Sequence, residues 1–183
     1  MLLIELAYYR KERIPEALFE KVCNLINKAY HNSEKELWKR EVSRVNKHEL
    51  LEAVADGSLI VARNRRHIVG TVVVKPIVDG KAVKFEMLCV ADAYRKKGVG
   101  LKLVEAIENW ALQNYLYHIQ LELLAPVEWR HPEKEFLKKW YRKLGYRPTA
   151  KIAFESMFPK RYRLLSCQCD FTVWEKKLTT ATP

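Results

Sequence analysis

The sequence contains few of the residues that mark disordered or disulfide-bonded chains. Of its 183 residues, only six are glycine, seven are proline and four are cysteine, while 49% are hydrophobic. This composition is typical of a packed domain, because disordered chains contain too little apolar surface to form a core. Four cysteines are too few for a disulfide framework at this length, so we expect reduced thiols. The length predicts a single domain spanning residues 1–183.

Long apolar runs and metal-binding patterns are also missing. No apolar stretch approaches the roughly 20 residues that cross a bilayer. The first residues lack the basic start and the length of a signal peptide. We therefore expect a cytoplasmic protein that does not enter a membrane. Cys167 and Cys169 are too close for a Cys-x-x-Cys zinc pair and no other metal spacing occurs, so we expect no metal site.

Acidic residues are too few to balance the basic ones. The chain has 33 Lys and Arg against 22 Asp and Glu, a formal charge of +11. Such an excess is typical of nucleic-acid binding, but here it is spread over several short clusters. The clusters are Arg10-Lys11, Arg63 to Arg66, Arg95 to Lys97, Lys138 to Lys143 and Lys160 to Arg163. A generally basic proteome and an acidic partner both stay open as explanations of this charge.

Hydrophobic spacing predicts seven strands and four helices. The strands are expected at residues 2–9, 59–63, 67–75, 82–90, 117–124, 146–150 and 166–176, with a turn at Asp79-Gly80. The helices are expected from Pro15 to Ala29 and at 47–56, 98–114 and 133–144. The sequence Ser33-Glu-Lys-Glu36 has the pattern of a capping box and predicts another short helical piece.

The segment from Phe85 to Gly100 joins a predicted strand to a predicted helix through a basic, glycine-containing turn. A helix that begins near Gly98 presents unpaired N–H groups and partial positive charge at that end, which stabilise an anion. Gly98 and Gly100 let a diphosphate approach the backbone, and the three basic residues before them add charge. The Walker A pattern does not fit, because it requires Ser or Thr where this chain has Lys102. The dinucleotide fingerprint does not fit either, because it requires Gly or Ala where this chain has Leu103.

The turn matches the acyl-CoA signature Arg/Gln-x-x-Gly-x-Gly/Ala. The matching residues are Arg95, Lys96, Lys97, Gly98, Val99 and Gly100. The chain therefore resembles the GNAT superfamily of acyl-CoA-dependent N-acetyltransferases. One departure is Asp92, where many members have proline. The resemblance implies an α/β (α+β) fold with a mixed, mostly antiparallel sheet of about seven strands flanked by about four helices. It also implies acetyl-CoA as cosubstrate and an amine as acceptor.

The resemblance also implies roles for individual residues. In the family, the fourth and fifth strands splay apart and free backbone N–H groups bind the acyl carbonyl and pantetheine, here at Leu88, Cys89 and Val90. Residues 139–146 resemble the second family motif, in which Tyr141 takes the position of the general acid. Glu86 is the candidate base, since strand alternation places it on the same face as Leu88 and Val90.

Other interpretations of these residues stay open. Tyr141 lies on an apolar helix stripe where it would be a core residue, and Glu86 is equally explained as a surface carboxylate. Cys89 is a conceivable acyl-accepting nucleophile with a histidine base, although a small core residue explains it as well. The main alternative function is a CoA-binding or basic, nucleic-acid- or ribosome-associated protein without catalysis. Helix one, residues 30–46 and residues 151–163 are expected to form the acceptor side, and a homodimer is not excluded.

Overall fold

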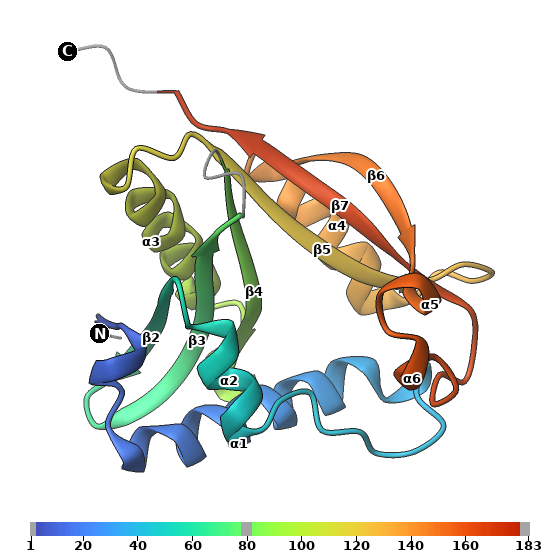
Figure 1. Cartoon of the computed structure of the whole chain (residues 1–183), viewed down its shortest axis with the longest axis horizontal. Helices are drawn as coiled ribbons and strands as arrows, with labels where there is room; N and C mark the ends of the chain where they lie inside the picture. Colours follow the sequence, from blue (N-terminus) through green and yellow to red (C-terminus); the bar gives the residue numbers. More distant parts are fainter. Residues whose placement is uncertain (1–2, 78–81, 180–183) are drawn as a thin grey trace.

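The computed structural model describes residues 3–77 and 82–179, which contain one seven-stranded sheet. The strand order is β1-β2-β3-β4-β5-β7-β6, and all neighbours are antiparallel except β4 and β5 (Figure 1). The strands are β1 Ile4–Tyr9, β2 Ser58–Asn64, β3 His67–Pro76, β4 Ala82–Val90, β5 His118–Pro126, β6 Arg147–Ala153 and β7 Cys169–Lys177. The predicted mixed, mostly antiparallel sheet is confirmed.

The described residues form six α-helices, two more than expected. The four predicted ones are α1 Glu16–Glu34, α2 Lys47–Ala53, α3 Val99–Gln113 and α4 Pro132–Lys143. Two one-turn helices, α5 Phe154–Met157 and α6 Pro159–Tyr162, lie in the connector before β7. Among the described segments, no helix is both long and apolar enough to cross a membrane.

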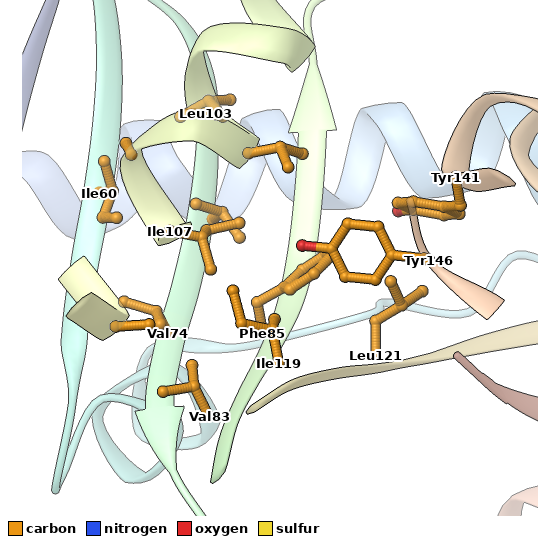
Figure 2. Close-up of a cluster of buried hydrophobic side chains, with 14 of the residues drawn as sticks. Ile60, Val74, Val83, Phe85, Leu103, Ile107, Ile119, Leu121, Tyr141 and Tyr146 are labelled. Carbon is orange, nitrogen blue, oxygen red and sulfur yellow. The ribbon is translucent and has the colours of Figure 1, made fainter. Parts of the chain in front are cut away.

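Apolar side chains cover both faces of the sheet. On the face that we call the α3 face, Leu103 and Ile107 pack with Phe85, Tyr141 and Tyr146 (Figure 2). On the opposite face, the α1 face, residues of α1 and α2 form a second cluster that includes Phe19, Val22, Ile26 and Leu50. A third cluster, described below, lies around α5.

The strands β4 and β5 separate along their length. They pair only between residues 82–84 and 118–120, so the stretch from Phe85 to Val90 has no partner on β5. Figure 1 shows the two strands diverging from their shared end. The divergence of the fourth and fifth strands that the family resemblance implied is therefore confirmed.

The capping box predicted at Ser33 is wrong. Helix α1 continues to Glu34 and is followed by a 3₁₀ turn at Lys35–Leu37 whose start has no side-chain cap. The Ser33 hydroxyl donates back to the Tyr30 carbonyl (3.4 Å), as serines do inside helices. The true capping box begins α2, where Asn46 and Glu49 cap each other. The predicted turn at Asp79-Gly80 lies outside the described residues.

Candidate active site

A cavity of about 770 Å³ lies where β4 and β5 diverge. It has lining residues from both faces of the sheet, including Tyr30 of α1 and Trp140 of α4. Nine of the predicted site residues line it, namely Glu86, Leu88, Cys89, Val90, Arg95, Lys96, Gly98, Gly100 and Tyr141. The two others do not. Val99 is buried in the core, and the Lys97 ammonium lies over the Tyr94 ring, 5.6 Å from its centroid.

The basic turn leads directly into α3. Gly98 has φ +81°, and α3 begins at the next residue, so the free N–H groups of its first turn follow the loop. A Cβ at Gly98 would meet nothing within 4 Å, which means that backbone conformation rather than crowding favours glycine there. At Gly100 a Cβ would lie 3.5 Å from the Trp140 ring. Asp92 accepts a hydrogen bond from Asn32 (2.7 Å), which ties the loop to α1.

Arg95, the first residue of the signature, forms an ion pair with Glu133 at the start of α4. Both side chains are 38% exposed, so solvent weakens the pair. A bound diphosphate would compete with Glu133 for this guanidinium. The sequence pattern did not predict the carboxylate.

Strand β4 contains a β-bulge at Met87. Glu86 lies opposite Val73 and Cys89 opposite Thr71, so β4 has one residue more than β3 between these pairs. Met87 has φ +56°, a left-handed conformation that is unusual for methionine. An extra residue of this kind reverses which side chains face which side of the sheet.

The bulge corrects the predicted orientation of Glu86. Phe85 packs on the α3 face and Met87 on the α1 face, although they are two residues apart. Leu88 and Val90 pack against the α3 face, whereas Glu86, next to Phe85, points to the α1 face. Glu86 is therefore not on the same face as Leu88 and Val90. The period of two that predicted a shared face does not hold across an inserted residue.

The Glu86 and Tyr141 side chains both contact neighbouring side chains. Glu86 accepts from the Lys75 ammonium at 2.9 Å. The Tyr141 ring lies in an aromatic cluster, 6.2 Å from the Phe85 centroid, 5.8 Å from that of Tyr146 and 6.3 Å from that of Trp174. Only 5% of Tyr141 is exposed, and burial raises the pKa of its hydroxyl above the ordinary value. The ring is thus a core component, while the residue also lines the cavity.

Comparison with known proteins identifies the family. The acetyltransferase (GNAT) domain family matches residues 55–148. The chain belongs to the GNAT family. No curated protein matches it in sequence.

Solved GNAT structures share the fold over nearly the whole chain. A GNAT family acetyltransferase from Elizabethkingia anophelis with acetyl-CoA bound is 15% identical, with a TM-score of 0.66 and coverage of 96% of this chain and 98% of that one. PaiA N-acetyltransferase from Thermoplasma acidophilum in complex with coenzyme A is also 15% identical, with a TM-score of 0.69 and coverage of 96% and 99%. A GNAT family acetyltransferase from Staphylococcus aureus Mu50 is 17% identical, with a TM-score of 0.65 and coverage of 97% and 100%.

Sequence reasoning missed several cavity residues of this GNAT chain. Tyr30, Glu34 and Lys134 line the cavity, yet only the first two lay in a segment expected near the acceptor. Val22, Ile26, Tyr30 and Glu34 follow at intervals of four along α1, so they share one helix face. This spacing in the sequence could have indicated that Tyr30 and Glu34 lie on the buried face of α1. Lys134 gave no comparable signal, because charged residues surround it in sequence.

Glu34 and Lys134 form a buried ion pair between α1 and α4. Their side chains are only 7% and 5% exposed. The Trp38 indole also approaches the Glu34 carboxylate, at 3.5 Å. Because neither buried charge is solvated by water, each is stabilised mainly by the opposite charge of its partner.

We expect Lys134→Met to destabilise the GNAT domain by about 3–5 kcal/mol, because it leaves the Glu34 carboxylate buried without its partner. Urea unfolding measures this loss. The double variant Glu34→Leu/Lys134→Met removes both charges and should recover most of the stability. A double variant as unstable as Lys134→Met would show that the charges are not coupled.

His131, in the loop before α4, does not line the cavity. It is 3% exposed and stacks on Trp129, with ring centroids 5.3 Å apart. Its Nε2 lies 3.0 Å from a Glu36 oxygen, but neither ring nitrogen makes a well-aligned hydrogen bond to the described residues. This placement favours a structural role in the loop before α4.

The Cys89 thiol is expected to be unreactive. It is 7% exposed, and burial raises its pKa to about 12, although a hydrogen bond with the Thr71 backbone acts in the opposite direction. A thiol with this pKa stays protonated at neutral pH and is a poor nucleophile. Iodoacetamide at pH 8 should therefore leave Cys89 unmodified, as detected by peptide mass spectrometry. The partly exposed Cys167 is the internal control, and rapid alkylation of Cys89 would reopen the role of acyl-accepting nucleophile.

Proposed function

We propose that this GNAT chain is an N-acetyltransferase that moves the acetyl group of acetyl-CoA directly to a primary amine in a ternary complex. The observation that carries the proposal is the continuous cavity. It connects the basic loop before α3, the unpaired edge of β4 and Tyr141. Its volume lies within the usual range of small-molecule sites.

The residues present suit acetyl-CoA. The N–H groups at the start of α3, with Arg95 and Lys96 beside them, suit the phosphates. The free backbone of β4 from Leu88 to Val90 suits the pantetheine arm and the acyl carbonyl. When bound, acetyl-CoA supplies a thioester that an amine can attack.

In the proposed reaction, the proton donor and the proton acceptor lie on opposite faces of β4. Tyr141, on the α3 face, donates a hydrogen bond and then a proton to the departing sulfur. Glu86, on the α1 face, accepts the proton that the amine loses, directly or through water. The carbon–nitrogen bond forms first and the carbon–sulfur bond then breaks; Glu86 gains the proton that the amine loses and releases it to solvent, and Tyr141 regains from solvent the proton that it gives to the sulfur. Backbone donors of Leu88, Cys89 and Val90 stabilise the oxyanion.

The direct test is titration with acetyl-CoA followed by a screen of amines that measures release of free CoA. Affinity for acetyl-CoA together with amine-dependent release supports the proposal. No affinity for acetyl-CoA, combined with tight and salt-sensitive binding of a short RNA, would instead favour a nucleic-acid-binding role. Comparing product masses from acetyl-, propionyl- and succinyl-CoA identifies the acyl group that the chain prefers.

A further inference from the structure

Arg44 is held rigidly on the α1 side of the cavity. The Asn27 side chain accepts from the N–H groups of Arg44 (2.8 Å) and Val45 (3.0 Å) and donates to the Val45 carbonyl (2.9 Å). Val45 itself is 1% exposed. Three hydrogen bonds to one side chain therefore fix the Arg44 backbone on helix α1, so its side chain projects from an ordered loop.

The Arg44 guanidinium lies over the Tyr30 ring, 5.2 Å from its centroid, and both residues line the cavity. Among the described residues, no carboxylate oxygen lies within 4.0 Å of it. Burial raises the pKa of the Tyr30 hydroxyl, whereas Arg44 beside it acts in the opposite direction. Arg44 thus presents donors to the cavity without an ion-pair partner.

The two carboxylates whose charges act on Arg44 are already paired elsewhere. Glu34 pairs with Lys134, and Glu86 pairs with Lys75 at 2.9 Å. Both carboxylates favour the charged form of Arg44. Together with Arg44, these two pairs carry three positive and two negative charges, so the group has a net charge of +1. A guanidinium without an ion-pair partner suits a monovalent carboxylate on the ligand.

An aromatic wall also lines the cavity. It consists of Trp38, Phe154, Phe158 and Phe171, all of which line the cavity. The Phe154 centroid lies 5.9, 5.3 and 5.5 Å from those of Trp38, Phe158 and Phe171. Such a surface favours an apolar or aromatic group on the acceptor.

We propose that Arg44 binds a carboxylate of the acceptor, and that the acceptor is an amino acid with an apolar or aromatic side chain. The guanidinium fork suits a carboxylate, and the aromatic wall suits the side chain. This inference rests on the proposed acetyl transfer for the identity of the reacting group. The anion site itself can be tested without turnover.

The test compares binding of two probes that differ only by a carboxylate, N-acetyl-L-phenylalanine and N-acetylphenethylamine. Isothermal titration of the full chain in the presence of CoA should give about 10- to 100-fold tighter binding of the carboxylate probe. Arg44→Met should abolish this preference, and Arg44→Lys should keep part of it. Equal affinity of the two probes for the wild-type chain, or no binding of either, overturns the proposal whether or not the variants fold.

Arg63→Met is the matched control. The Arg63 guanidinium also lies over a tyrosine ring, 6.0 Å from the Tyr9 centroid, but it does not line the cavity. This variant loses the same charge and a similar contact, so it should keep the preference for the carboxylate probe. A preference that persists in Arg44→Met, or disappears in Arg63→Met, contradicts the assignment to Arg44.

A turnover measurement separates this inference from the proposed function. Release of CoA with L-phenylalanine should exceed release with phenethylamine, mainly through a lower KM. Equal or faster release with phenethylamine overturns the carboxylate site and leaves acetyl transfer standing. Carboxylate-dependent binding without CoA release from any amine supports the site and contradicts acetyl transfer.

Discussion

Replacing Tyr141 by phenylalanine should lower turnover by about 100-fold while leaving the affinity for acetyl-CoA unchanged, because only the proposed proton donor is lost. The aromatic ring remains, so its contacts with Phe85, Tyr146 and Trp174 are retained. Steady-state release of CoA measures turnover, and titration measures the affinity. A thermal melt checks that the core is intact.

Tyr146→Phe is the control for this variant. The Tyr146 ring packs beside that of Tyr141, but its hydroxyl approaches Glu108 (3.5 Å) and the residue does not line the cavity. Its turnover should stay near that of the wild-type chain. Unchanged turnover of Tyr141→Phe across the pH range would make Tyr141 a core residue without a chemical role.

The pH dependence of turnover follows from the burial of Tyr141. Burial raises its pKa above the model-compound value of about 10. A raised pKa means that the hydroxyl keeps its proton as the pH rises through the neutral and mildly alkaline range. Tyr141 should therefore cause no alkaline loss of turnover below about pH 10. A loss near pH 8 that is absent in Tyr141→Phe would show the opposite.

Replacing Gly98 by aspartate should weaken binding of acetyl-CoA by about 100-fold, which corresponds to about 2.7 kcal/mol. The new carboxylate would stand at the start of α3, where the phosphates are proposed to bind, and like charges repel strongly at short range. A negative charge at the start of a helix interacts favourably with the helix dipole, so it does not destabilise the folded protein without acetyl-CoA. The loss should therefore appear in binding rather than in folding.

Gly98→Asn separates the charge from the backbone strain. Asparagine has the same size as aspartate and tolerates the left-handed conformation that Gly98 adopts, with φ +81°. It should lose only a few-fold in affinity, because no charge is added. Equal affinity of the aspartate variant and the wild-type chain would place the phosphates elsewhere.

Much of the fold was predictable because it follows from local patterns. Strand β4 was predicted at its observed bounds, since alternating apolar residues lead into a basic glycine turn. The helices α5 and α6 were not predicted, because one-turn helices are too short to show a hydrophobic period. The end of α1 was misplaced because Ser33 and Glu36 match a capping pattern, although Ser33 lies inside α1 and Glu36 lies in the 3₁₀ turn that follows.

The sequence by itself determined the family and the basic loop, because the Arg-x-x-Gly-x-Gly turn and the flanking strand and helix are local features. Only the tertiary structure decided which residues come together around the cavity. The bulge at Met87 turns Glu86 toward α1, the Asn27 side chain fixes Arg44 over Tyr30, and Lys134 reaches Glu34 from a distant helix. Backbone register and contacts between distant segments depend on packing of the whole chain, so no local pattern encodes them.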